Sequence, residues 1–600
     1  MNRRSFCMSV PAAAVPALLR AQAGPAVEDP VEKDVPQRTP AIALNHLGFR
    51  PSVGRKVLVV RLTGGIPPDR FLLRDIGSST FHFTRSLTTT RGDLGACMTA
   101  DFTDLRREAI YQITVGEEHS VPFFLREDVW RRTLPKAVGY YRFQRCGVDV
   151  PGVHSICHLD DARRRDTGEH VNVIGGWHDA GDLRKWMDVT MLNAISLLNL
   201  ARNIANPQPG DPTHEQVLDE VRHGNRYFLK MQDTDGKVWH DTAGGVNGDN
   251  SDNHWTDNIA GTADDRYINT RKTEEIAATF ATLQGLANQL YAASDSAYAQ
   301  LCLRAGVRAW DASTRQGSTL ALAWWALAAC ELYRATHQAG YRDEAMRLGR
   351  DLMSRQATAF LEDQRQIRGY WTEGAEPSND PPAPSHFRPY FNVVFPAMPA
   401  YALLELHETF KDADDRTKWI DAVRMHLDEY AIPMSERNAY RIIPSGLFVG
   451  RPTAETYRPL AGRLTYRYFM PVRKQFWWQG INSHLENYAL LAARFAVLQK
   501  KAAGAGKQYV DLAYRQLEWV MGANPFGACL MTDEGMRNPY PHSRFVGLIP
   551  GGIMNGIAGN AEDEPVLDQA YAIDWRTNEY WSPHVAYYIW SVSTLEGPEG

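Results

Sequence analysis

The chain has 600 residues, of which 44% are hydrophobic and 22% charged, and this composition is typical of a soluble globular protein with a large core. Its 46 glycines and 34 prolines are too few for a collagen-like or low-complexity protein. The formal net charge is −5 and no stretch is densely basic, which argues against a nucleic-acid partner.

Residues 1–23 predict an export signal. An arginine pair precedes a short apolar run and the small-residue site Ala21-Gln22-Ala23, which is the order of a cleavable signal peptide of the twin-arginine type. The alternative is an arginine-bearing tail. Neither this run nor any other segment has the ~20 apolar residues that a membrane-spanning helix needs. We therefore expect a periplasmic or secreted protein, with a linker at 24–40.

Period-two patterning follows the linker. Tyr111, Ile113 and Val115 fall on one face of a short apolar segment, and similar segments recur at ~8–12-residue spacing with glycine and proline pairs between them. This spacing favours a small β-sandwich, which we place at 41–127.

Helical periodicity dominates the rest of the chain. Roughly ten to twelve amphipathic helices are expected, and the segment 320–332 is apolar on nearly all sides, as helices of an inner ring are. Long irregular segments lie at 233–268, 363–391 and 432–478, and such loops in a compact domain are usually functional. A double ring of helices over 128–600, with its loops gathered at one end, accounts for both features.

The sharpest motif has two aspartates in a glycine-rich turn. Residues 175–182 are Gly-Gly-Trp-His-Asp-Ala-Gly-Asp, so Asp179 and Asp182 stand before an apolar helix and could hold one water molecule between them. The alternative is a helix N-terminus that one aspartate caps.

Two more motifs lie near the C-terminus. Glu579 follows Asn578 among aromatic residues, and an apolar pocket raises the pKa of a carboxyl group; a helix cap is again the alternative. A proline-rich loop presents His542 and Arg544, and alone it is compatible with any structured loop.

Together these segments resemble glycoside hydrolase family 9. The family has a G-G-W-x-D-A-G-D segment, a late P-H-x-R loop and an N-E pair near its C-terminus. The segment 45–49 also looks like the opening of the immunoglobulin-like module in one branch of the family, and 477–483 is similar to its W-G-S-N helix start. The matching motif positions are 175–182, then Pro541, His542 and Arg544, then Asn578-Glu579.

The resemblance implies an inverting β-glycanase on a six-hairpin (α/α) barrel, preceded by a small immunoglobulin-like β-sandwich. Inversion needs a base and an acid with carboxyl groups ~6.5–9.5 Å apart and a water molecule between. Carried over by position, Asp182 is the base, Asp179 orients the water and Glu579 is the acid. The residues expected to bind substrate are His542, Arg544, Trp177, Trp478 and Asn578.

Two departures from the family pattern lie where substrate is held. Ser543 stands where the family often has a second histidine, and 581–584 differ from the Asn-Ala continuation usual after the glutamate. These differences leave the preference for unsubstituted cellulose open.

We expect an endo-acting hydrolase of β-1,4-glucan: cellulose, cello-oligosaccharides or mixed-linkage glucan. An exo-acting enzyme on amino-sugar oligosaccharides of the chitosan type is one alternative, because long loops could wall off a cleft. A non-catalytic glycan-binding protein is another, disfavoured because all three carboxylates are present. The sequence does not define the oligomeric state.

Two cysteines and two histidines predict a structural zinc site. Two thiolates and two imidazoles form a closed tetrahedral set with no open position for catalysis, and the sandwich-bearing branch of the family looks similar here. His154 and His170 are substitute ligands, and a disulfide between the cysteines is the alternative. The predicted ligands are Cys146, Cys157, His158 and His178.

Calcium is a further expectation from the resemblance, because many members of the family bind it. The candidate oxygen donors are Asp264, Asp265, Glu274 and Glu275. No EF-hand spacing surrounds them, and a charged helix face is the alternative.

Overall fold

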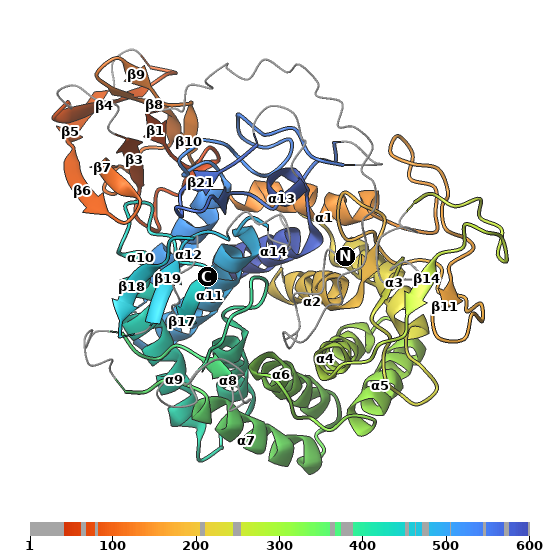
Figure 1. Ribbon diagram of the computed structural model, residues 1–600. Coiled ribbons are helices and arrows are strands. Elements are labelled where there is room, and N and C mark those ends of the chain that lie inside the picture. The colour runs from red at the N-terminus through yellow and green to blue at the C-terminus, as the bar shows by residue number, and fades with distance from the viewer. Residues whose placement is uncertain are drawn as a thin grey trace.

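The computed structural model describes most of the chain beyond residue 40 and shows a β-rich domain beside a ring of helices (Figure 1). The predicted signal peptide and linker, and also Arg544 and Trp478, lie outside the described residues. None of the helices in the described part is long and apolar enough to cross a membrane. The described residues are 41–61, 68–78, 82–204, 210–243, 254–359, 367–373, 388–449, 455–462, 464–470, 479–503, 506–543, 548–568 and 575–597.

The β-rich domain packs two sheets around its own apolar core, at the upper left of Figure 1. Tyr111, Ile113 and Val115 all point into this core, as their alternation predicts. Neighbouring strands are antiparallel except for one parallel pair, β2 with β10. One sheet has the order β1 (Ile42–Ala43), β3 (Val57–Arg61), β7 (Gly95–Asp101), β6 (Thr88–Gly92); the other has β2 (Gly48–Phe49), β10 (Phe123–Leu125), β8 (Ala109–Val115), β4 (Arg70–Asp75), β5 (His82–Ser86), with β9 (Glu118–His119) paired to β8.

His46 joins this domain to the helical one. Its backbone amide donates to the Met521 carbonyl over 2.8 Å, and its Nδ1 accepts from the Met536 amide over 3.2 Å. A Cβ at Gly522 would come within 2.6 Å of the imidazole. The two domains are therefore tightly packed against each other at this point.

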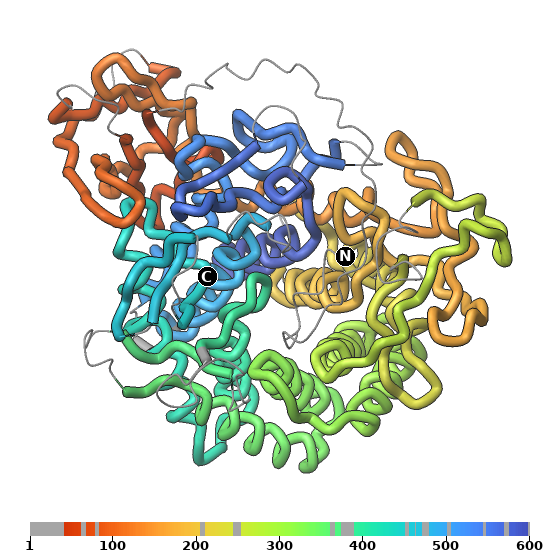
Figure 2. The backbone as a smooth tube through the Cα atoms, in the orientation of Figure 1, coloured from red at the N-terminus to blue at the C-terminus, as the bar shows by residue number. Residues whose placement is uncertain are grey.

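The helical domain is a double ring, whose inner helices are buried almost all round while the outer helices are amphipathic. Figures 1 and 2 show each outer helix followed along the chain by an inner one. The residues from Leu320 to Leu332 are all buried, so the predicted inner-ring helix is confirmed. The inner helices are α2 (Met187–Asn203), α4 (Glu274–Tyr291), α6 (Thr319–Thr336), α8 (Met398–Thr409), α11 (Asn482–Ala503) and α14 (Ser582–Glu596); the outer ones are α1 (Leu134–Phe143), α3 (His214–Lys230), α5 (Ser296–Asp311), α7 (Ala339–Ser354), α9 (Arg416–His426) and α12 (Lys507–Val520).

Side-chain caps fix where several of these helices begin. Thr213 forms a capping box with Gln216 at the start of α3, and Thr273 and Ser318 accept backbone amides at the starts of α4 and α6. Each such bond satisfies an amide that has no partner within the helix.

Small sheets occupy the segments that lead into the inner helices, so irregular chain collects at the N-terminal ends of that ring. Short helical turns complete the described chain at η2 (Arg131–Thr133), η3 (Leu427–Ala431), α10 (Ile432–Ser435) and α13 (Trp575–Asn578). The small strands are β11 (Arg163–Arg164), β12 (Lys185–Trp186), β13 (Asp241–Thr242), β14 (Tyr267–Asn269), β15 (Thr372–Glu373), β16 (Arg388–Pro389), β17 (Gly446–Val449), β18 (Arg458–Ala461), β19 (Leu464–Arg467), β20 (Ala558–Gly559) and β21 (Pro565–Val566).

Candidate active site and metal centre

The aspartate motif lies on a loop that packing holds rigid before α2. Gly175 and Gly176 both have positive φ, +105° and +80°, which glycine adopts without strain. A Cβ at Gly176 would come within 2.8 Å of the Tyr227 ring. Trp177 is completely buried, and its indole N–H donates to Glu220 over 2.8 Å. Trp177 therefore anchors the loop in the core, and its position contradicts the prediction that it binds substrate.

Asp179 is held by the start of α14. Its Oδ2 accepts the indole N–H of Trp581 over 2.8 Å, across 402 positions of sequence. Its backbone carbonyl accepts the Ser582 amide over 2.8 Å. Asp182 accepts the amide of Arg184 over 3.3 Å. Because α2 begins only after Trp186, neither aspartate caps that helix, and the capping alternative is wrong.

Gly181 is the point at which the separate motifs meet. A Cβ there would lie 2.6 Å from the His542 carbonyl oxygen and 3.3 Å from Cγ of Glu579. The Gly181 carbonyl accepts the hydroxyl of Ser543 over 3.3 Å. The fold therefore brings the aspartate loop, the His542 loop and Glu579 together at one place.

The three carboxyl groups share a nearly water-free environment. Asp179 is fully buried, Asp182 is 1% exposed and Glu579 is 3% exposed. Burial, with the added charges of Glu579 and Asp182, raises the pKa of Tyr580, so both carboxylates act on one phenol. Asp179 and Asp182 are at least as buried as Glu579, so exposure alone does not distinguish the proposed acid from the aspartates. Glu579 also precedes the N-cap of α14, which is Trp581, so it does not cap the start of that helix.

Asn578 positions the neighbouring loop instead of reaching outward. It is fully buried, its amide donates to the Tyr540 carbonyl over 3.0 Å, and its own carbonyl accepts the His542 amide over 3.1 Å. These contacts contradict direct substrate binding by Asn578. His542 is half-buried at the loop that Asn578 holds.

Two exposed aromatic side chains were not anticipated from the sequence. Trp255 is 38% exposed and stacks on His158, with ring centroids 5.6 Å apart. Tyr540 is 62% exposed beside the His542 loop. Tyr540 directly precedes the motif that begins at Pro541, but no motif surrounds Trp255, so only its exposure identifies Trp255 as a candidate.

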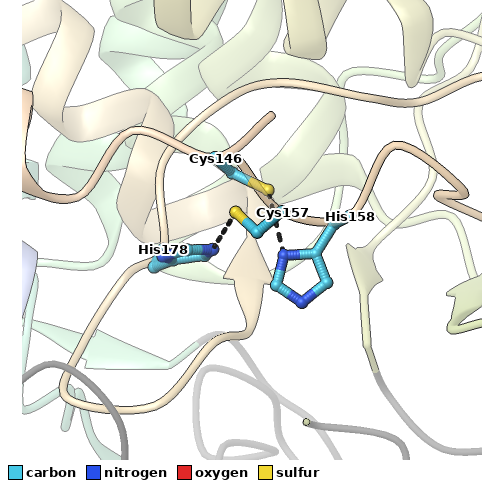
Figure 3. A group of neighbouring side chains, drawn as sticks. All are labelled: Cys146, Cys157, His158 and His178. Atoms are coloured by element: carbon cyan, nitrogen blue, oxygen red, sulfur yellow. Dashed lines mark hydrogen bonds between the residues drawn. The ribbon is translucent and has the colours of Figure 1, made fainter. Parts of the chain in front are cut away.

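The predicted zinc ligands form a compact buried cluster (Figure 3). The ligand atoms of Cys146, Cys157, His158 and His178 all lie within 4.8 Å of one another. Sγ of Cys146 is 3.5 Å from Nδ1 of His158, and Sγ of Cys157 is 3.9 Å from Nε2 of His178. Both cysteines are free thiols, which contradicts the disulfide alternative. The substitute ligand His170 is directed elsewhere, to the Asp160 carbonyl.

The surroundings of the cluster suit a metal. Nε2 of His158 lies 3.0 Å from the His254 carbonyl, a contact that directs the lone pair of Nδ1 toward the thiols. Although burial opposes it, the hydrogen bond from Cys157 and the nearby charge of Lys185 hold the pKa of Cys146 well below its usual range. Metals bind the thiolate form. Two thiols and two imidazoles at these distances therefore fit a tetrahedral ion.

Only part of the predicted calcium set comes together. Carboxylate oxygens of Asp264 and Asp265 lie within 4.8 Å of one from Asp160, which the sequence did not single out. Glu274 instead accepts the indole N–H of Trp325 at 3.0 Å. Glu275 accepts the Ser318 hydroxyl at 2.6 Å. These two glutamates stand at the start of α4, away from the aspartate cluster.

Comparison with known proteins identifies the family. The family model for Glycosyl hydrolase family 9 matches residues 130–549. The chain belongs to glycoside hydrolase family 9. The match ends before Glu579, so the role of this residue rests on the geometry at Gly181.

Curated family 9 relatives are distant in sequence. The chain is 26% identical over 294 residues to a cellodextrinase of Butyrivibrio fibrisolvens, a match that covers 42% of this chain and 50% of the relative. It is 22% identical over 564 residues to a xyloglucan-specific endo-beta-1,4-glucanase of Bacteroides ovatus, covering 84% and 82%. The chain thus spans about half the length of the first relative and most of the second.

Solved family 9 structures share the fold along nearly the whole chain. The crystal structure of a metagenome-derived family 9 endoglucanase superposes with a TM-score of 0.67 at 22% identity, covering 93% of this chain and 99% of that one. The combination of a family 9 barrel and an N-terminal β domain agrees with the predicted architecture.

Proposed function

We propose that this family 9 protein is an inverting, endo-acting hydrolase of β-1,4-linked glucan, with cello-oligosaccharides as the simplest substrates. The proposal is supported chiefly by one observation: the loop of Asp182, the His542 loop and Glu579 come together around Gly181. The named activities of the relatives, a cellodextrinase and a xyloglucan-specific endo-glucanase, support a β-glucan substrate.

The proposed reaction divides its work among three carboxyl groups. Asp182 removes a proton from a water molecule as that water attacks the anomeric carbon. Glu579 gives its proton to the glycosidic oxygen as the bond to the leaving sugar breaks. Asp179, fixed by the Trp581 indole, orients the water. Exclusion of solvent strengthens each of these interactions.

Aromatic and polar groups around the carboxylates would hold the sugar. We assign hydrogen bonding of sugar hydroxyls to His542, together with Arg544, and ring stacking to Trp478 and Trp255. The 38% exposure of the Trp255 indole supports stacking, because sugar rings present apolar faces to such surfaces.

We propose a structural zinc ion on Cys146, Cys157, His158 and His178. When bound, zinc would cross-link two loops and supply no catalytic chemistry, because four protein ligands close its coordination. His178 is followed directly by Asp179, so the ion would hold the catalytic loop in place. Export of an already folded protein by the twin-arginine route suits a metal loaded before export.

We propose that calcium binds at Asp160, Asp264 and Asp265. Hard cations prefer carboxylate oxygens, and Oδ2 of the fully buried Asp160 has no hydrogen-bond partner among the described residues. A test is calcium titration of the purified protein against an Asp160→Asn variant. Loss of binding in the variant supports the site, and unchanged binding refutes it.

We also propose that residues 1–23 direct export, that 41–127 form the β-sandwich and that 128–600 form the barrel. Mass spectrometry of the protein from its native cell fraction tests the first boundary. A mature N-terminus near residue 24 supports it, and an intact Met1 in that fraction contradicts it.

The decisive experiment is a proton NMR time course with cellohexaose. Inversion by Asp182 and Glu579 predicts the α-anomer as the first product, with mixed product lengths. Glu579→Gln should lower kcat by at least about 100-fold, and the exposed Glu562→Gln should not. Initial β-anomer would contradict inversion, and equal effects of the two variants would contradict the assignment of the acid.

A further inference from the structure

Asn555, which lies in none of the sequence motifs, holds the backbone of Glu579 at two points. The Asn555 backbone amide donates to the Glu579 carbonyl over 2.8 Å. Its side-chain amide donates to the Trp575 carbonyl over 2.9 Å, and the same carbonyl accepts the backbone N–H of Glu579 over 3.1 Å. Asn555 therefore contacts both ends of the single helical turn, α13, that leads into Glu579.

His584 orients the side chain of Asn555. Its Nε2 lies 3.0 Å from Oδ1 of Asn555, and its Nδ1 lies 2.5 Å from Oγ of Ser483. Because the side-chain nitrogen of Asn555 already donates to Trp575, the side-chain oxygen accepts, and Nε2 of His584 carries the proton. Nδ1 then accepts the Ser483 hydroxyl, so both ring nitrogens have one defined role.

This set of side chains is shielded from water and tightly packed. Ser483, Asn555 and His584 are all buried, with at most 2% of the surface of each exposed. Burial lowers the pKa of His584 to about 3, so its ring is neutral above that pH and keeps its tautomer. A Cβ at Gly480 would come within 2.1 Å of the Asn555 carbonyl oxygen. The arrangement around Asn555 therefore has little freedom to move.

The same imidazole packs against the residue that holds Asp179. The rings of His584 and Trp581 meet edge to face, with centroids 5.5 Å apart, and the Trp581 indole N–H donates to Asp179 over 2.8 Å. His584 lies in the first turn of α14. It therefore comes from the segment 581–584, where the chain departs from the family pattern.

We propose that His584 is a positioning residue for the proposed acid: through Asn555 it fixes the backbone of Glu579, and with it the carboxyl group, relative to the scissile bond. A general acid must lie within about 3.2 Å of the atom that it protonates, and a displacement of about 1 Å can lower a rate roughly 100-fold. This inference rests on the proposed function for the role of Glu579, whereas the contacts that hold its backbone do not depend on that role.

The variant His584→Phe tests the positioning role. It removes both ring nitrogens and keeps a ring against Trp581, so the support of Asp179 remains. We expect kcat on cellohexaose to fall at least about tenfold and KM to change less than about twofold, because the contacts of His584 act on the acid and not on sugar binding. His584→Gln, whose side-chain amide can donate to Asn555, should recover most of the lost kcat.

His407→Phe is the matched control. His407 is also buried, and its Nδ1 donates to the Arg416 carbonyl over 3.0 Å near the end of α8, so this variant should leave kcat unchanged. Thermal unfolding checks that the variants fold. If His584→Phe does not fold, Ser483→Ala takes its place, because it keeps the imidazole and removes only its partner at Nδ1; it should lower kcat about threefold.

A leaving group that needs no proton isolates the role of the acid. Dinitrophenolate leaves without protonation, so hydrolysis of dinitrophenyl β-cellobioside does not depend on Glu579 as a proton donor. His584→Phe should therefore lower kcat on this substrate less than about threefold. A variant that is only partly folded loses the same factor on both substrates, and equal losses would overturn the positioning role.

Amide hydrogen exchange tests the same contacts without turnover. Exchange in the segments 553–557 and 575–581, followed by mass spectrometry, should be about tenfold faster in His584→Phe and unchanged in His407→Phe. Unchanged exchange of both segments in His584→Phe would overturn the inference. Faster exchange together with a wild-type protein that hydrolyses neither substrate would contradict the proposed hydrolase function and leave the backbone contacts of Glu579 supported.

Discussion

Replacing Gly181 with alanine tests whether three distant segments must meet within van der Waals contact for activity. The added Cβ would lie 2.6 Å from the His542 carbonyl oxygen, whereas ordinary contact begins at 3.4 Å. The loop must therefore retreat by about 0.8 Å, because a close-packed interior has no slack. The same Cβ would press on Cγ of Glu579 at 3.3 Å. Displacement of catalytic groups on this scale lowers kcat by roughly 100-fold, with a stability loss of about 1–3 kcal/mol.

The assay is steady-state hydrolysis of cellohexaose alongside thermal unfolding. Gly139→Ala is the control, because a Cβ there, within α1, meets nothing within 4 Å. That variant should keep full activity and gain up to about 1 kcal/mol from helix propensity. A Gly181→Ala enzyme with unchanged kcat would refute the geometric argument. So would a loss of kcat matched by Gly139→Ala.

The remaining predictions concern the metal cluster and a buried acid. The Cys157→Ser variant should lose bound zinc, have a lower kcat and be less stable by about 4 kcal/mol. The control is Cys330→Ser, which is buried within α6 and should leave the zinc content unchanged. Elemental analysis measures the zinc and urea unfolding the stability, and zinc retained in the Cys157 variant would contradict the site. Burial raises the pKa of Glu486 well above 4.5, so its stabilising contribution is complete below pH 4.5 and is lost as pH rises through the raised pKa. Glu486→Gln should flatten the fall of unfolding free energy with pH by up to about 1.4 kcal/mol per unit, and parallel curves for the two proteins would contradict this.

The local sequence singled out the aspartate loop as a candidate catalytic segment but left its conformation open. The spacing of Asp179 and Asp182 fits both a helix cap and a water-binding pair, because both uses need a carboxylate before an apolar helix. The structure decides between them because strand β12 separates Asp182 from α2. That strand pairs with β13, more than fifty residues later, and such a distant partner cannot be deduced from the motif.

The sequence motifs did not predict which of their side chains are buried in the structure. Trp177 lies in a motif rich in functional residues, yet Gly224 of α3 leaves room for its ring, where a Cβ would come within 2.0 Å. Asn578 likewise faces the Tyr540 loop. A conspicuous motif gives residue types, but the helix packed beside it decides which of them reach solvent.

Sites whose residues come singly from distant segments could not be predicted from the sequence, because no local motif marks them. Asp160 joins Asp264 and Asp265 from about a hundred positions earlier, without a motif of its own. The rings of Trp371, His426 and His484 likewise come from three separate segments and line one hollow. Only the closing of the helical ring brings such residues together.

The proposed zinc ligands and the proposed catalytic aspartates lie on the same loop. Asp179 and Asp182 are almost fully buried on one short loop, and like charges in such surroundings repel. The loop that carries the aspartates has little regular secondary structure, so its conformation depends on packing and on contacts with its neighbours. The backbone of His178 donates to Gln144, and that of Cys146 donates to Gly176, so the proposed zinc ligands are bonded into the loop on both sides. A closed metal site at this position would help to hold the buried aspartates together, because the proposed ligand His178 is followed directly by Asp179, the proposed water-orienting residue.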